Sequence, residues 1–158
     1  TVHGRTKNQG YSGKSDWVRI GEAKKIATVP ILANGDIHRP EQVSEALEIT
    51  GADGVSIARG ALGNPWFFKN IRIANNYEST NNVDVDLKER MNIVLQHAKL
   101  HVAYYGERGI VTFRKHLSWY FKTNKLGMEI PGIKEWRGKL VRVNSLKELE
   151  EILQQLTI

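Results

Sequence analysis

The sequence of 158 residues contains no cysteine, which excludes disulfides and thiolate metal sites. No apolar run approaches the roughly 20 residues that a membrane-spanning helix needs. Thr1 opens an apolar, strand-like segment without the basic flank of a signal peptide, so we expect no leader sequence. An initiating Met is also missing, and we therefore expect a fragment or a processed form of a longer protein. These absences favour a cytoplasmic protein with no membrane partner.

What is present is a foldable composition with an excess of positive charge. Hydrophobic residues make up 41% of the chain and charged residues 25%, which suits one ordinary domain or two small ones. The net charge is +6, and residues 107–142 hold nine Lys and Arg against three Asp and Glu. Such an excess favours a polyanion as partner, although a solvated face is the commoner meaning of a charge run.

The first 74 residues alternate short apolar runs with helical patterns. The runs are residues 1–3, 29–33 and 54–58, and all three have the character of strands. Helical spacing recurs between them, at Trp17, Ile20, Ala23 and Ala27 and again at Val43, Ala46 and Leu47. Pro40 suits the first turn of the second helix, and Gly51 suits its end. The alternation predicts parallel strands with right-handed crossovers, and strands buried on both faces.

The rest of the chain has helical periodicity only. Residues 75–83 are rich in turn formers and are predicted to be a linker. One helix is expected over 87–105, a second near 107–125, an irregular stretch over 126–133, and a last helix from Ser145, where Ser145 and Glu148 form a capping box. The apolar stripe of the first is Leu87, Met91, Val94, Leu95, Ala98, Val102 and Tyr105, and that of the last is Leu146, Leu149, Ile152, Leu153 and Leu156. The predicted units are 1–74, which is α/β, and 84–158, which is all-α.

Each predicted strand is followed by a loop that is able to meet an anion. The first loop begins with His3, the second is residues 34–36, and the third begins with Arg59. In the third loop, Asn64 is predicted to cap a helix that Pro65 opens. Glycine lets backbone N–H groups approach a ligand closely, and arginine binds phosphate through two nitrogens. Taken singly, each feature has a structural explanation, but parallel strands bring the three loops to one rim, where (β/α)₈ barrels commonly bind phosphate.

Residues 113–125, placed on one helix, separate an apolar face from a basic face. The apolar face is Phe113, Leu117, Tyr120 and Phe121, and the basic face is Arg114, Lys115, Ser118, Lys122 and Lys125, with Trp119 at its edge. Because no acidic residue interrupts the basic face, we expect it to contact RNA, chiefly at phosphates.

Four strings resemble the tRNA-dihydrouridine synthase family. Residues 3–6, 9–13 and 16–17 are similar to the sixth strand and loop of its barrel, and residues 30–37 to the seventh. Residues 50–66, which end in Arg-Gly-Ala-Leu-Gly-Asn-Pro-Trp, resemble the eighth. Residues 114–117 with Trp119 and Tyr120 resemble a signature of the C-terminal helical domain. The match is weakest across 75–90.

The resemblance implies the last three βα units of a (β/α)₈ TIM barrel followed by a C-terminal helical bundle that holds tRNA. It implies an FMN enzyme that reduces uridine of tRNA to 5,6-dihydrouridine, with NADPH as electron donor. The FMN contacts carried over are His3, Asn34, Gly35, Asp36, Ala58 and Arg59, and Ala58 stands where many members have Gly. The residues expected to contact RNA are Arg5, Lys7, Lys14, Arg114, Lys115, Lys122 and Lys125.

The family's proton donor is a cysteine on an earlier loop of the barrel. This chain has none, so we expect no catalytic residue here, an inactive fragment, and no metal site. Three strands cut from a barrel expose an edge, and we expect residues 1–74 to self-associate or to be partly rearranged. Two alternatives stay open. One is another FMN- or phosphate-binding barrel oxidoreductase that acts on a small molecule, and the other is a non-catalytic RNA-binding module.

Overall fold

The structure is a computed structural model that describes residues 1–74, 85–122 and 130–156. The chain divides into two compact units. The first unit is Thr1–Ala61 with Pro65–Val83, and the second unit is Leu62–Asn64 with Asp84–Ile158. The predicted linker, residues 75–83, lies outside the described residues. None of the described helices has the length and apolarity that crossing a bilayer requires.

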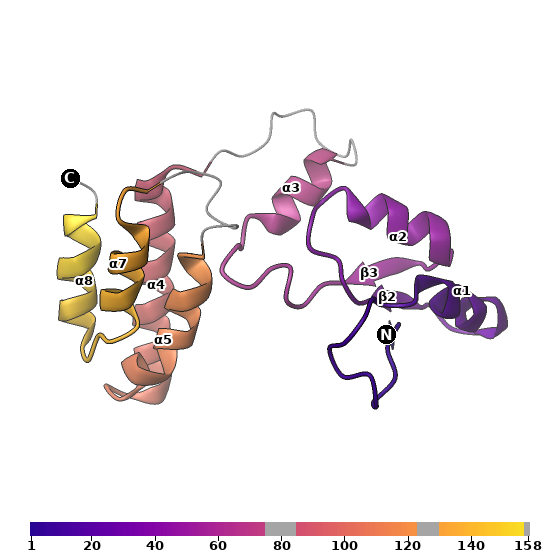
Figure 1. Ribbon diagram of the computed structural model, residues 1–158, viewed down its shortest axis with the longest axis horizontal. Coiled ribbons are helices and arrows are strands. Elements are labelled where there is room, and N and C mark those ends of the chain that lie inside the picture. The colour runs from indigo at the N-terminus through magenta and orange to yellow at the C-terminus, as the bar shows by residue number, and fades with distance from the viewer. Residues whose placement is uncertain (75–84, 123–129, 157–158) are drawn as a thin grey trace. The chain divides into compact units, whose positions relative to one another are not determined.

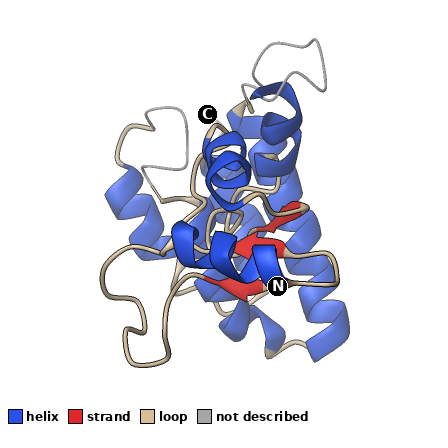
Figure 2. Ribbon diagram, turned by 90° about the vertical axis from the view of Figure 1, so that its right-hand side faces the viewer, coloured by secondary structure: helices blue, strands red, loops and turns tan. Residues whose placement is uncertain are grey.

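The first unit is a three-stranded parallel sheet with helices (Figures 1 and 2). Its elements in chain order are β1 (Val2–His3), α1 (Trp17–Ile26), β2 (Leu32–Asn34), α2 (Gln42–Thr50), β3 (Gly54–Ser56) and α3 (Phe67–Ala74). The strand order is β1-β2-β3, so the predicted α/β organisation with a parallel sheet is confirmed. His3 pairs with Asn34, and Asn34 pairs with Ser56, which places the carboxyl ends of all three strands at one edge. The three strands share one parallel register, so the rearrangement that we considered is not seen.

Local signals explain where the first two helices begin and end. The side chain of Asp16 accepts the backbone N–H of Arg19 at 3.0 Å and caps α1. Gly51 ends α2 with a φ of 60°, a left-handed conformation that suits glycine, and its N–H donates to the Leu47 carbonyl. The predicted stop at Gly51 is therefore confirmed.

The prediction that the strands are buried on both faces is wrong. Ile31 and Ala33 pack with Ile20 of α1 in one core cluster. Leu32 points to the opposite face, because side chains alternate along a strand, and it is 40% exposed. Among the described residues, the helices thus cover the face that carries Ile31 and Ala33.

The predicted start of α3 is also displaced. Asn64 and Pro65 were expected to cap and open the helix, but α3 begins at Phe67. The N–H of Asn70 donates to the Trp66 carbonyl at 3.0 Å, which closes the first helical turn after Trp66. Asn64 and Pro65 belong instead to the turn that precedes it.

The second unit is all-helical in its described residues: α4 (Leu87–Tyr105), α5 (Gly109–Tyr120), α7 (Ile133–Leu140) and α8 (Leu146–Gln155). The core draws on every one of these helices: its buried members include Met91, Val94 and Ala98, then Phe113, Leu117, Tyr120 and Phe121, then Leu140, Leu149 and Leu153. The predicted apolar face of residues 113–121 and the predicted core of the last helix are confirmed. Tyr105 is an exception to the predicted stripe, because it is 62% exposed at the end of α4.

Two boundaries in the second unit differ from expectation. Helix α5 ends at Tyr120, not near residue 125: Phe121 leaves the helical conformation, with a φ of −106° and a ψ of 23°, and the Lys122 N–H donates to the Trp119 carbonyl three residues back. Helix α7 was not predicted at all. Glycine at positions 132 and 138 disfavours a helix and obscures the helical spacing of the apolar residues. The expected irregular stretch, 126–133, lies partly outside the described residues.

The capping box of α8 is present in modified form. The hydroxyl of Ser145 accepts the Glu148 N–H at 3.1 Å, as predicted. The Glu148 carboxylate reaches one residue further back and accepts the N–H of Asn144 at 2.7 Å. Both contacts satisfy backbone donors at the start of the helix.

Candidate functional site

The six residues predicted to bind a cofactor line one pocket at the carboxyl edge of the sheet. This rim pocket has a volume of about 30 Å³ and also includes His38, Ser56 and Gly60. The predicted six are His3, Asn34, Gly35, Asp36, Ala58 and Arg59. The common register of the strands brings the three loops together, as the sequence predicts. A volume this small suits one end of a ligand, such as a phosphate group.

A sharp turn after β2 shapes the pocket. Gly35 has a φ of 124° and Asp36 a φ of 57°, so two consecutive residues adopt conformations that are rare for residues with a side chain. A Cβ atom at Gly35 would lie 2.2 Å from the Ser15 hydroxyl, which leaves room only for glycine. The turn directs the Asp36 carboxylate back over the first loop.

Asp36 organises the positive charge around the pocket. Both of its carboxylate oxygens accept from Arg5, at 2.9 and 2.6 Å, and one also accepts the Ser15 N–H at 2.8 Å. Arg59 lies 3.4 Å and His38 3.8 Å from the other oxygen. Burial alone would raise the pKa of Asp36, but the Arg5 and Ser15 hydrogen bonds and the charges of Arg5 and His38 hold that pKa below its ordinary value.

Arg5, one of the residues predicted to contact RNA, is engaged within the first unit. Its side chain is 4% exposed, and beyond Asp36 it donates to the carbonyls of Ser12 and Gly13. The guanidinium therefore ties the first loop to the turn after β2. Lys7 and Lys14, in contrast, are exposed on that loop.

His3 and Asn34 each make a hydrogen bond within the fold, and each also lines the pocket. His3 Nδ1 accepts the N–H of Arg5 at 3.1 Å, so a neutral His3 carries its proton on Nε2, as a donor. The amide nitrogen of Asn34 donates to the Ser56 carbonyl at 2.7 Å and ties β2 to β3. Asn34 also lines the rim pocket.

Arg59 is held in place from two sides. Besides its contact with Asp36, its guanidinium lies 4.6 Å from the ring centre of Tyr11. Gly60 packs so closely on the second loop that a Cβ there would lie 2.3 Å from the Ile37 carbonyl oxygen. The arginine, the donor of His3 and the closely approaching backbone form a donor set that suits a phosphate, with Asp36 as its internal counter-charge.

Comparison with known proteins decides the family. The family model described as dihydrouridine synthase matches residues 1–158. The chain belongs to the dihydrouridine synthase family. Its relatives include a "Probable tRNA-dihydrouridine synthase 1" of Synechocystis sp., 36% identical over 98% of this chain and 42% of that protein. Another is the "tRNA-dihydrouridine synthase B" of Pseudomonas aeruginosa, 37% identical over 90% of this chain and 41% of that protein. The chain thus spans about two fifths of the length of these relatives.

The basic face predicted for residues 113–125 is only partly available. Lys115 and Lys122 are exposed, and the described residues offer them no acidic partner. Arg114 instead donates to the carbonyls of Val143, at 2.9 Å, and Arg142, at 3.2 Å, and to the Asn144 side chain. Arg114 therefore fastens α5 to the segment between α7 and α8, and Lys125 lies outside the described residues.

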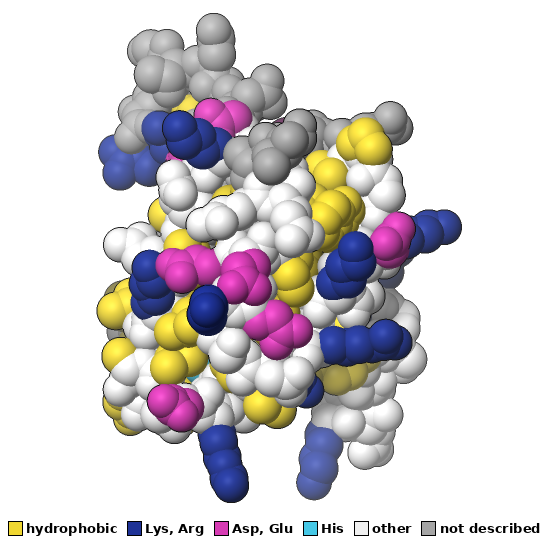
Figure 3. Space-filling model, turned by 90° about the vertical axis from the view of Figure 1, so that its left-hand side faces the viewer, with side chains coloured by type: hydrophobic (Ala, Val, Ile, Leu, Met, Phe, Trp, Pro, Cys, Tyr) yellow, Lys and Arg dark blue, Asp and Glu magenta, His cyan; other side chains and the backbone are white. Residues whose placement is uncertain are grey.

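Another face of the second unit mixes charges of both signs (Figure 3). Lys99 lies 3.0 Å from Glu150, and Lys139 lies 3.2 Å from Glu135. Such paired lysines attract a polyanion less than unpaired ones do. The contrast favours Lys115 on α5 and Lys122 just after it as the polyanion contacts.

A buried arginine of the second unit contacts Gly63, which belongs to the Arg-Gly-Ala-Leu-Gly-Asn-Pro-Trp motif of residues 59–66. Arg90 is 2% exposed, and its guanidinium donates to the carbonyls of Gly63, at 3.4 Å, and Tyr120, at 3.3 Å. Gly63 has a φ of 69°, and a Cβ there would lie 2.3 Å from the Trp119 carbonyl carbon. Gly63 thus serves packing.

One group of side chains that could bind a metal ion was not predicted from the sequence. His97, His101 and His116 each offer one ring nitrogen, and these three atoms lie within 4.8 Å of one another. The signal for the first two was their spacing, since residues four apart share a helix face. The third comes from another helix, which no spacing in the sequence reveals.

Proposed function

We propose that this chain is the C-terminal part of a tRNA-dihydrouridine synthase whose parent protein reduces uridine in tRNA with FMN and NADPH. Membership of the family and the printed names of the relatives support this assignment. In it, residues 1–74 are the last three βα units of a (β/α)₈ barrel. Residues 84–158 are a helical bundle that holds tRNA, and the protein is cytoplasmic.

The observation that carries the proposal is the convergence of three strand ends on the rim pocket. His3, Asn34, Gly35, Asp36, Ala58 and Arg59 hold the phosphate end of FMN. Arg59 supplies the charge and His3 Nε2 a donor, while Asp36 keeps Arg59 in position. The added methyl of Ala58 leaves its backbone N–H available, so it is compatible with this role.

FMN held here, once reduced by NADPH, would supply the hydride that reduces the uracil ring. The residues of this chain bind and orient, and none supplies the proton, because the chain contains no cysteine. The fragment alone is therefore inactive as an oxidoreductase.

The polyanion that binds the exposed lysines is tRNA. Lys115 on α5 and Lys122, which follows α5, meet its phosphates, with Lys7 and Lys14 near the rim pocket as further contacts. These contacts follow the shape of the RNA and not its sequence.

Binding of FMN and of riboflavin, which lacks the phosphate, tests the flavin part of the proposal. Quenching of flavin fluorescence by the full chain reports binding of each. We expect FMN to bind at least about tenfold more tightly than riboflavin, because a bidentate arginine–phosphate contact is worth more than 1.4 kcal/mol. Arg59→Ala should abolish this preference.

The control is Arg19→Ala, which removes an exposed arginine outside the pocket and should leave the preference intact. Equal binding of FMN and riboflavin, or an unchanged preference in Arg59→Ala, would contradict the assignment of the rim pocket. Tighter binding of small anions than of tRNA across a salt series would instead favour a small-molecule oxidoreductase.

A further inference from the structure

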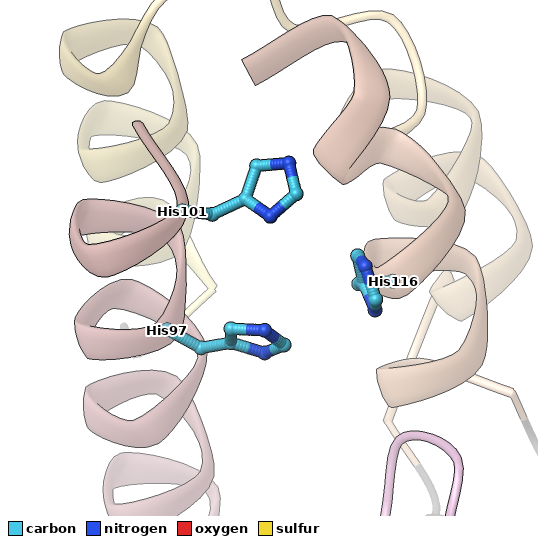
Figure 4. A group of neighbouring side chains, drawn as sticks. All are labelled: His97, His101 and His116. Carbon is cyan, nitrogen blue, oxygen red and sulfur yellow. The ribbon is translucent and has the colours of Figure 1, made fainter. Parts of the chain in front are cut away.

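Three histidines meet between the two longest helices of the second unit. His97 and His101 lie one turn apart on α4, and His116 lies on α5 (Figure 4). Their rings point toward one another from the two helices, and one ring nitrogen from each lies within 4.8 Å of the others. We call these three residues the histidine cluster.

The cluster rests on an apolar floor. The ring of Phe113, which is completely buried, lies 4.9 Å from that of His97, 5.4 Å from that of His101 and 5.3 Å from that of His116. All three histidines are half-buried. An apolar floor weakens the competition of water for any ion held above it.

Hydrogen bonding fixes the tautomer of His101. Its Nε2 lies 2.8 Å from the Thr112 hydroxyl, and that hydroxyl donates its own proton to the Gly109 carbonyl at 2.9 Å. The Thr112 oxygen must therefore accept from Nε2–H, which leaves the lone pair of His101 on Nδ1. Figure 4 shows one ring nitrogen of His101 turned toward His97.

His97 has a similar partner on its other side. Its Nδ1 lies 3.0 Å from the Tyr120 hydroxyl, which leaves Nε2 to face the cluster. Burial raises the pKa of Tyr120, so its hydroxyl remains protonated and its oxygen can accept from Nδ1–H. A histidine that binds a metal commonly donates its second ring N–H in this way.

Two of the three rings, those of His97 and His116, have a pKa that favours the neutral form a metal ligand needs. Burial, followed by the charges of His97, Lys115 and His101, lowers the pKa of His116 to about 4. Burial, with His101 next, also lowers the pKa of His97. The described residues offer His116 no hydrogen-bond partner, so both of its ring nitrogens are available.

We propose that His97, His101 and His116 bind one zinc ion and so link α4 to α5. Imidazole nitrogens suit zinc, and three of them leave a fourth position for water. Tetrahedral Zn–N bonds of about 2.0–2.1 Å require nitrogens about 3.3 Å apart, so the rings close inward by small rotations when the ion binds. The positive charge of Lys115 opposes binding of the zinc ion. Removal of this charge should therefore strengthen zinc binding.

The full chain, without a histidine tag and stripped with a chelator, is dialysed against zinc chloride. We expect one zinc ion per chain, and a melting temperature that rises with zinc concentration. His101→Ala and His116→Ala should each weaken binding by at least about tenfold. The matched control His38→Ala removes a histidine of the first unit and should bind zinc as the unaltered chain does.

A measurement without substitutions covers the case in which a variant fails to fold. In NMR spectra of the unaltered chain, zinc should shift the imidazole signals of His97, His101 and His116 and leave those of His3 and His38 in place. Shifts at His3 or His38 alone, less than one zinc per chain at saturation, or equal binding by every variant would each overturn the proposal. In those cases the three rings serve only as packing on Phe113.

Discussion

The guanidinium of Arg5 meets both carboxylate oxygens of Asp36, at 2.9 and 2.6 Å, across 31 positions of the sequence. Arg5 is almost completely buried, while Asp36 keeps 24% of its side chain exposed toward the rim pocket. The same carboxylate lies 3.4 Å from Arg59. One ion pair thus fastens the first loop to the second and leaves the third loop's arginine oriented at the pocket.

Replacement of Arg5 should destabilise the first unit. Arg5→Met leaves the Asp36 carboxylate without its main partner, and we expect the free energy of unfolding to fall by about 2–4 kcal/mol. Arg5→Lys should recover only part of this loss, because an ammonium cannot meet both oxygens in one plane. Urea unfolding measures the change, and Lys7→Met on the same loop is the matched control. A loss below about 0.5 kcal/mol for Arg5→Met would show that the ion pair is dispensable.

Acid should remove the contribution of Asp36. Because the pKa of this carboxyl is lower in the fold than its ordinary value of 3.8, its stabilising effect is complete above that value. The effect is lost as the pH falls through the lower folded pKa. The difference in free energy of unfolding between the unaltered chain and Asp36→Asn should therefore be constant from pH 7 to pH 5 and shrink below about pH 4. A difference that stays constant down to pH 2 would contradict the lowered pKa.

Reversal of the charges of Lys115 and Lys122 should weaken tRNA binding. Lys115→Glu with Lys122→Glu removes two exposed cations, and we expect at least about a tenfold loss of affinity and a salt dependence reduced by about one to two ions. Lys139→Glu with Lys147→Glu makes the same charge change at lysines that already have acidic partners. This control variant should bind tRNA more tightly than the variant altered at Lys115 and Lys122, as measured by fluorescence anisotropy. Equal losses in both pairs would mean that only net charge matters.

The arrangement of the pocket could be predicted because it follows from strand direction. Once residues 1–3, 29–33 and 54–58 are parallel strands, their carboxyl ends must share an edge, and His3, Asn34 and Arg59 come together. Stops such as Gly51 are equally local, since a left-handed residue at a helix end favours glycine.

What could not be predicted depends on partners distant in the sequence. Arg5 and Arg114 look like surface cations, yet Asp36 holds the first and the carbonyls after α7 hold the second. Leu32 reads as a core residue, but its burial depends on what covers that face of the sheet. The histidine cluster needs the packing of α4 on α5, which brings His116 to His97.

Two glycine substitutions should change stability in opposite directions. A Cβ at Gly60 would lie 2.3 Å from the Ile37 carbonyl oxygen, so Gly60→Ala must push the third loop away from the second. Gly138 lies inside α7 with nothing within 4 Å of the added carbon, so Gly138→Ala gains helix propensity alone. We expect Gly60→Ala to lower the free energy of unfolding by about 1–3 kcal/mol and Gly138→Ala to raise it by about 0.5–1 kcal/mol. Thermal unfolding by circular dichroism measures both.

Because the rim pocket depends on the close approach at Gly60, Gly60→Ala should also weaken FMN binding, and Gly138→Ala should not. Intact FMN binding in a folded Gly60→Ala chain would mean that the contact of the two loops serves stability only.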